Sequence, residues 1–207
     1  GYAPCPGICT ETVAQGGNTF VNTGAIRELL AEDENPEFTP SLFGLTFSDT
    51  PPKANNHADR FSYLYADFSV MDWRYNPEKR QYELWQDKEL STGRYTLEKS
   101  ADLGTNDPIA FDNIIFLYTR YVDYRKIFWD IHFDDGNTDQ RGILLRDGNL
   151  YHIRWAAKKY DEPLLFFDLQ GEPIALKPGR TWITLGNLEN RIEQVDEREW
   201  DMHFIIK

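Results

Sequence analysis

Long apolar runs are absent from this chain. A membrane-spanning helix needs roughly 20 consecutive apolar residues, and no stretch of the 207 residues approaches that length. No signal peptide or lipidation motif is visible either. We therefore expect no transmembrane segment within these residues, and any native anchor would lie upstream of Gly1.

Positive charge is in short supply. The 22 Lys and Arg residues face 34 Asp and Glu residues, which gives a net charge of −12. Nucleic acid is bound by basic side chains that displace counterions from its phosphates, and no basic stripe is present here. Anionic lipid headgroups are disfavoured for the same reason. The charge thus argues against nucleic acid as a partner and favours a soluble, mutually repelling surface.

Cysteine is scarce, since the chain has only Cys5 and Cys9. In a reducing compartment a C-x3-C pair is half of a metal site, but no second Cys or His pair completes it. In an oxidising compartment the pair can close a small loop that Pro6 and Gly7 help to turn. We favour this local disulfide over two free thiols, although its two Cα atoms must come within about 7 Å.

Signatures of known enzyme classes are also missing. The chain has no G-x-S-x-G, no H-E-x-x-H, no P-loop and no dinucleotide-binding G-x-G-x-x-G. We favour a non-catalytic protein over an enzyme, name no catalytic residue and expect no cofactor. A metal site is an alternative, because His132 and His152 lie on the polar faces of predicted strands and can meet across a sheet near Asp134. Solvent-facing strand histidines are our preferred interpretation.

Aromatic residues, in contrast, are abundant. The chain contains 6 Trp, 11 Tyr and 13 Phe, and 41% of its residues are hydrophobic. Aromatic side chains suit a pleated, half-buried surface, and this apolar content is enough to bury a core. We therefore expect a folded protein that is mainly β (α+β overall).

The first 60 residues contain the only helix that we expect. Residues 1–22 are rich in Gly, Pro, Thr and Asn and predict an irregular lead-in. Thr23 can cap a short helix through about Asp33, with three apolar residues on one face. Residues 34–60 hold four prolines and predict a linker that contains an apolar cluster, which should pack onto a neighbour. The cluster consists of Leu42, Phe43, Leu45 and Phe47.

From Phe61 onward the pattern predicts strands. Residues 125–133 alternate apolar and polar side chains, which is typical of a half-buried strand. The Asp147-Gly148 pair between two apolar runs predicts a β-hairpin. Further turns are expected at Asn76-Pro77, Gln170-Gly171 and Pro178-Gly179. This spacing predicts an antiparallel sandwich or a strongly bent sheet. The side chains expected to be buried are Ile127, Trp129, Ile131, Tyr151, Ile153 and Trp155.

Two surface features are candidates for function. Trp85 lies on the same strand face as Gln81 and Glu83, so it is our candidate for an exposed, ligand-stacking aromatic residue. At the C-terminus, apolar and polar residues alternate as in a strand. This strand either closes an edge of its own sheet, which we favour, or augments a sheet in another subunit. Its apolar face comprises Trp200, Met202, Phe204 and Ile206.

An ordered set of motifs resembles a known family. The set comprises Tyr75 with Tyr82, the run DPIAFDNII at 107–115, GILLRDG at 142–148, Trp155, Phe167-Asp168 with Gly171, and LKPGRTWI at 176–183. In this order the motifs resemble the C-terminal domain of the YerB-like bacterial lipoproteins, a family of unknown function. Residues 16–23 resemble the last part of the preceding domain, with Gly16-Gly17-Asn18 where a Pro-His-Asn run usually stands.

The resemblance implies three regions and a location. We expect a remnant of a preceding domain with a linker at 1–60, a β-rich domain at 61–186 and a C-terminal extension at 187–207. The family also implies an extracytoplasmic place in the bacterial cell envelope or secretion. We expect an interaction or structural module whose partners are other envelope proteins. The alternatives are a hydrolase that modifies cell wall or polysaccharide, and a subunit of a larger surface or membrane-associated assembly.

Overall fold

The chain divides into two compact units, Gly1–Pro40 and Ser41–Lys207, and each is described by itself. The computed structural model describes residues 8–13, 16–32, 44–54, 56–66, 69–89, 95–123, 125, 129–132, 140–157 and 163–205. The boundary expected near residue 60 lies inside the second unit. Two of the apolar residues expected in the linker, Leu42 and Phe43, fall outside the described residues, as does the predicted strand residue Ile127.

The first unit contains a hairpin and a helix. Strands β1 (Ile8–Val13) and β2 (Gly16–Val21) pair antiparallel, where we had expected only an irregular lead-in. The predicted helix is confirmed as α1 (Thr23–Glu32). Its cap, however, is Asn22 and not Thr23, because the Asn22 side-chain oxygen accepts a hydrogen bond of 3.1 Å from the N–H of Ala25. That bond satisfies one of the free donors of the first turn.

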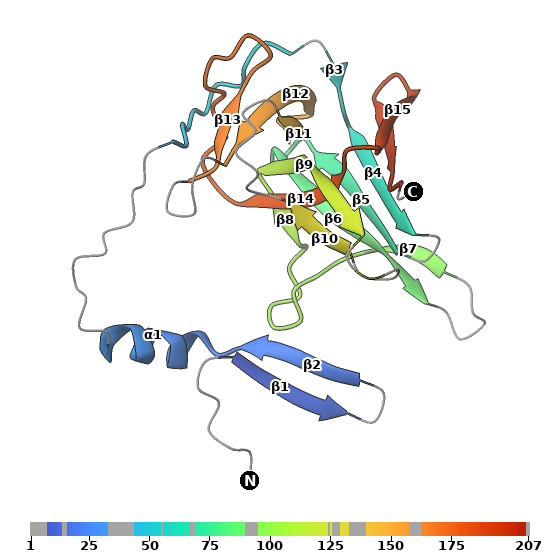
Figure 1. Ribbon diagram of the computed structural model, residues 1–207. Coiled ribbons are helices and arrows are strands. Elements are labelled where there is room, and N and C mark those ends of the chain that lie inside the picture. The colour runs from blue at the N-terminus through green and yellow to red at the C-terminus, as the bar shows by residue number, and fades with distance from the viewer. Residues whose placement is uncertain are drawn as a thin grey trace. The chain divides into compact units, whose positions relative to one another are not determined.

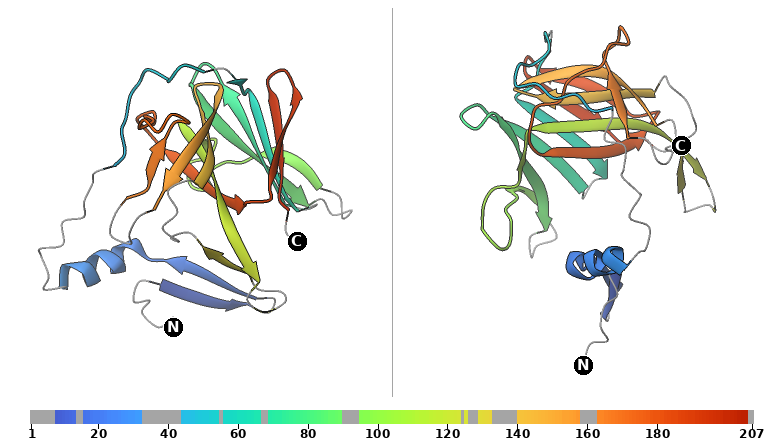
Figure 2. Two further views of the ribbon diagram at one scale, coloured as in Figure 1. Left: turned by 45° about the horizontal axis from the view of Figure 1, so that its top comes forward. Right: turned by 90° about the vertical axis from the view of Figure 1, so that its left-hand side faces the viewer.

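The described strands of the second unit form two seven-stranded sheets, which make up a mainly β sandwich (Figures 1 and 2). The first sheet contains β3 (Asn56–His57), β9 (Asn113–Asp123), β10 (Trp129–His132), β11 (Gln140–Arg146), β12 (Asn149–Ala156), β13 (Leu165–Phe167) and β14 (Thr181–Asn187). The second contains β4 (Arg60–Ala66), β5 (Ser69–Asn76), β6 (Gln81–Glu89), β7 (Tyr95–Lys99), β8 (Ala110–Phe111), β15 (Arg191–Asp196) and β16 (Glu199–His203).

Aromatic and aliphatic side chains fill the space between the two sheets. Trp73 of β5 is 2% exposed and lies against Phe111 and Trp182, with ring centroids 6.0 and 5.5 Å apart. Tyr63 of β4 packs edge-on against Phe116 of β9 at 4.9 Å. Offset and edge-on pairs of this kind stabilise a core beyond the area that they bury. The abundance of aromatic residues is therefore mainly structural.

The first sheet is buried on both faces. Tyr151, Ile153 and Trp155 lie in a second apolar cluster on the face away from the second sheet, and their predicted burial is confirmed. Leu150 points the other way but is also buried (1% exposed), because that face meets the second sheet. Phe166 of β13, a strand of the same sheet, also belongs to this outer cluster, together with Ile174 and Leu176 from the segment that follows β13.

One predicted core residue is not buried. Ile131 is 37% exposed, so that prediction is wrong. Its strand, β10, pairs only with residues 120–123 at the end of β9, where the side chains are no longer in the core. The side chain of Trp129 lies outside the described part of the chain.

The predicted hairpins are confirmed, and two strand pairs differ from the antiparallel expectation. β11 and β12 flank the Asp147-Gly148 turn, and β5 and β6 flank the turn that begins at Pro77. β14, however, runs parallel to β9, and β16 runs parallel to β4. Both strands reach their partner after a long return of the chain, so adjacent hairpins do not dictate their direction.

The C-terminal strand lies inside its own sheet. β16 pairs with β15 on one side and with β4 on the other. Trp200 and Met202 are buried, at 8% and 0% exposure, and Phe204 packs against the same core. Because both edges of β16 are occupied, no edge is left to augment another subunit's sheet, and the alternative of a partner strand is ruled out for residues 199–203. Ile206 lies outside the described residues.

Candidate functional site

The structure does not bring the two candidate metal histidines together. His132 lies on β10 and His152 on β12, and the strand order β10-β9-β11-β12 places two strands between them. Neighbouring strands lie about 4.8 Å apart, so three steps separate them by about 14 Å. His132 contacts Arg120 at 3.1 Å and Asp130 at 3.7 Å. Within the described part of the chain, no group of three metal-ligating side chains is found, and Asp134 lies outside it.

Trp85 is only partly accessible. The Arg74 guanidinium carbon lies 4.0 Å from the centre of the Trp85 ring, and the Lys99 ammonium lies 5.8 Å from it. Both cations are held in place: Arg74 donates to the buried carboxylate of Asp72 at 2.6 Å, and Lys99 pairs with Glu83. A ring covered by cations in this way presents little free face to a stacking ligand.

The two cysteines cannot be compared as a pair. Cys9 pairs with Phe20 in the β1–β2 ladder, whereas Cys5 lies outside the described residues. The disulfide between them stays a prediction.

No described helix is long and apolar enough to cross a membrane.

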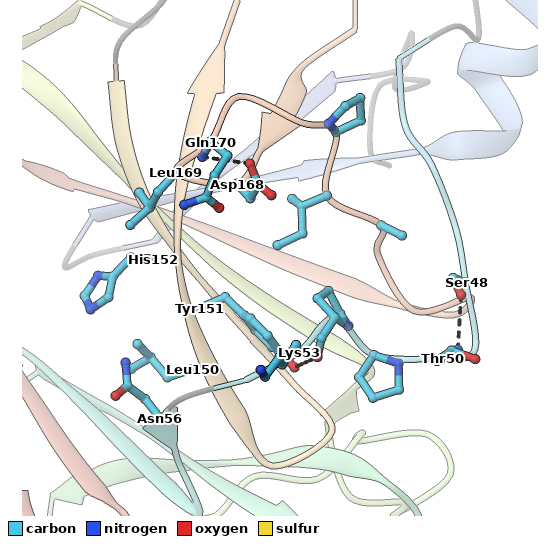
Figure 3. A pocket seen from close by; sticks show the side chains of 15 residues that line it. Ser48, Thr50, Lys53, Asn56, Leu150, Tyr151, His152, Asp168, Leu169 and Gln170 are labelled. Carbon is cyan, nitrogen blue, oxygen red and sulfur yellow. Dashed lines mark hydrogen bonds between the residues drawn. The ribbon is translucent and has the colours of Figure 1, made fainter.

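A groove of about 720 Å³ lies beside β12, and we call it the β12 groove (Figure 3). One wall is the segment 48–56 and the other is the loop 168–175, and β12 contributes Leu150, Tyr151 and His152. Successive residues of a strand point to opposite faces, and Figure 3 shows Tyr151 and His152 on opposite sides of β12. The groove therefore lies at the edge of the strand and not on one face of the sheet.

Hydrogen bonds fix both walls of the groove. The Tyr151 hydroxyl donates to the carbonyl of Pro52 at 3.0 Å, and burial raises the pKa of Tyr151 to about 12, so the donor proton is retained. On the other wall, one Asp168 oxygen accepts hydrogen bonds of 2.9 Å from the N–H groups of Gln170 and Glu172. A groove with both walls braced is preorganised for a ligand.

Arg146 connects the two walls of the groove. Its side chain is fully buried, and its guanidinium donates to the carbonyls of Ala175 and Ser48 at 2.9 Å each. The Asp147 carboxylate accepts from the same guanidinium at 3.0 Å. Arg146 thus ties one residue of each wall to the end of the β11–β12 hairpin.

The Asp147 carboxylate belongs to a polar cluster that also joins the two sheets. It accepts from Arg80 at 2.7 Å and lies 3.7 Å from the Lys177 ammonium, which pairs with Asp112 at 3.3 Å and bonds the Arg80 carbonyl. Gly179 lies so close to Asp112 that a Cβ atom would collide with its carboxylate. All of these residues except Arg80 come from three of the motifs that carry the family resemblance, so these motifs meet in space.

Two ionisable side chains in the groove have defined surroundings, those of His152 and Asp168. Partial burial lowers the pKa of His152 below its ordinary value of 6.5, so the imidazole is neutral at pH 7. The Asp168 carboxylate is engaged by backbone N–H groups, as described above. The remaining polar lining consists of neutral side chains and Lys53.

Sequence reasoning singled out His152 but not the groove that contains it. The walls come from segments more than 90 residues apart in the chain, and neither carries a ligand-binding motif. The available signal was the family resemblance, which includes Asp147-Gly148 and the Phe167-Asp168 pair with Gly171. Both turn out to position this site.

Comparisons with known proteins agree with that resemblance. The family model described as the C-terminal domain of a protein of unknown function (DUF3048) matches residues 61–183. The fold is similar to the crystal structure of the YerB protein from Bacillus subtilis, with a TM-score of 0.56 and 19% sequence identity. The match covers 81% of this chain and 52% of the YerB chain, so this chain spans about half the length of that protein. No curated protein matches.

Proposed function

This chain belongs to the DUF3048 family through its C-terminal domain, and on that premise we propose that it is a non-catalytic module that works outside the bacterial cytoplasm by binding another macromolecule. The β12 groove is the binding site. The location is proposed from the likeness to the YerB-like lipoproteins, and the partner is proposed to be an envelope protein.

One observation supports binding above all: the β12 groove is open, large and braced from both sides. Its volume of about 720 Å³ lies within the usual range of ligand pockets. Exposed apolar surface is present at its rim, where Leu169 is 56% exposed. Leu169 can therefore contribute an apolar contact to a ligand in the groove.

Assembly into a larger surface complex is a second candidate. An apolar hollow of about 320 Å³ lies elsewhere on the first sheet, lined by Phe47, Leu164 and Ile183 among others. Phe47 is 56% exposed and Ile183 is 43% exposed. Water-exposed apolar side chains in one hollow favour contact with another subunit.

Site-directed photocrosslinking tests the proposed binding site. We expect p-benzoylphenylalanine in place of Leu169 to give discrete covalent adducts in cells that produce the full-length protein. The matched control places the same group at Leu103, which is fully exposed on a turn that does not line the groove. Adducts that depend on the Leu169 position support the proposal. Identical adducts from both positions, or none from Leu169, contradict it.

A further inference from the structure

On the outer edge of β12, one residue has backbone groups that pair with no described residue. The Asp147-Gly148 turn has two residues with positive φ, 52° and 72°, which is the geometry of a two-residue hairpin turn. Arg146 and Asn149 are therefore a hydrogen-bonded pair of the β11–β12 ladder. Because such pairs alternate in an antiparallel ladder, the backbone groups of even-numbered β12 residues point away from β11.

Two residues before and two residues after His152, the outward backbone groups of β12 are paired with other strands. Leu150 pairs with Asn56 of β3, and Arg154 pairs with Phe167 of β13. His152 lies between these two pairs. In continued registers its partner would be Ala54 or Leu169, but within the described part of the chain neither residue pairs with it. Among the residues that the structure describes, the N–H and the C=O of His152 therefore have no backbone partner, and both face the β12 groove.

We infer that the β12 groove binds an extended polypeptide, one residue of which forms two main-chain hydrogen bonds with His152. This inference rests on the proposed function, because it names the class of ligand that the groove takes. A peptide residue in extended conformation presents one C=O and one N–H on the same side, at the spacing that a strand edge offers. Strand addition of this kind derives affinity from the main chain and specificity from alternate side chains.

The dimensions and the charge of the groove agree with this ligand. The paired positions Leu150 and Arg154 are four residues apart, which is about 14 Å along a strand. The open edge therefore admits one or two peptide residues in the plane of the sheet. The rest of the peptide must leave the sheet between the two walls of the groove. The walls offer Pro51, Leu169 and Ile174 to apolar side chains. They carry one lysine and one engaged aspartate, so a polyanion has no basic surface to bind.

The test uses a displayed library of random nine-residue peptides, selected against the full chain and then measured by calorimetry. His152→Pro removes the N–H that faces the groove and no ladder bond, so the hairpin should tolerate it. His152→Ala is the matched control, because it keeps that N–H. Selected peptides should bind His152→Pro at least tenfold more weakly than His152→Ala.

A second measurement covers the case in which His152→Pro does not fold. N-methylation of a selected peptide at successive positions should abolish binding at the one residue whose N–H donates to the His152 carbonyl. Equal affinity for His152→Pro, an N-methyl scan without a sensitive position, or a selection without enriched peptides overturns the inference. If photocrosslinking at Leu169 gives adducts but the library gives no enriched peptide, the proposed function holds and the ligand class is wrong.

Discussion

Replacing Asp147 with Asn is expected to lower the free energy of unfolding by about 3–5 kcal/mol, measured by urea denaturation. The carboxylate is 6% exposed and interacts with Arg80, Arg146 and Lys177, of which Arg146 is completely buried. Without the negative charge, the buried Arg146 guanidinium remains uncompensated, and that cost exceeds the loss of the ion pairs themselves.

Asparagine isolates the electrostatic effect at this position. Asp147 has a φ of 52°, and Asn is as well suited as Asp to positive φ in a hairpin turn. The matched control is Asp59→Asn, which breaks a 2.6 Å ion pair with Arg198 between half-exposed side chains. The control should cost less than about 1 kcal/mol. If both variants lose the same small amount, the polar cluster does not stabilise the sandwich.

Deleting residues 199–207 should abolish cooperative unfolding, as followed by tryptophan fluorescence in urea. The deletion removes β16, leaves β4 without a neighbour on that side and separates β15 from the sheet. It also removes the buried side chains of Trp200 and Met202. Losing two such side chains costs roughly 5–10 kcal/mol, which is comparable with the total stability of about 5–15 kcal/mol of a typical domain.

A shorter truncation provides the control for this deletion. Removing only residues 206–207 leaves every strand pair of β16 in place and should leave the urea midpoint nearly unchanged. A cooperative transition of unchanged midpoint after the longer deletion would contradict the placement of β16 inside the sheet.

Local sequence patterns predicted the hairpins and part of the core. The Asp147-Gly148 turn has its own signal, and alternation correctly assigned Tyr151, Ile153 and Trp155 to one face. Alternation did not show that the opposite face is also buried, because that depends on the second sheet. The exposure of Ile131 was missed for a related reason: its strand has the right pattern but lies beyond the core.

The candidate site was beyond the reach of local patterns. β14 pairs in parallel with β9, and β16 pairs in parallel with β4. In each pair the two strands lie more than 60 residues apart in the chain, and no nearby turn specifies the partner. The β12 groove likewise depends on where β3 begins and β13 ends. Only the family resemblance connected distant segments, because its motifs include Asp112, Asp147 and Lys177, whose side chains interact in the structure. It contained no information on the open edge at His152.

Native-state hydrogen exchange, resolved by NMR for single amides, tests the open edge of β12 most directly. The amides of Leu150 and Arg154 are paired with Asn56 and Phe167, and those of Tyr151 and Ile153 bond to β11. In the ligand-free chain, we expect all four to be protected and the His152 amide to exchange at least a hundredfold faster than they do. Addition of a bound peptide should slow the His152 amide toward its neighbours. A His152 amide as protected as those of Leu150 and Arg154 in the free chain would contradict the account.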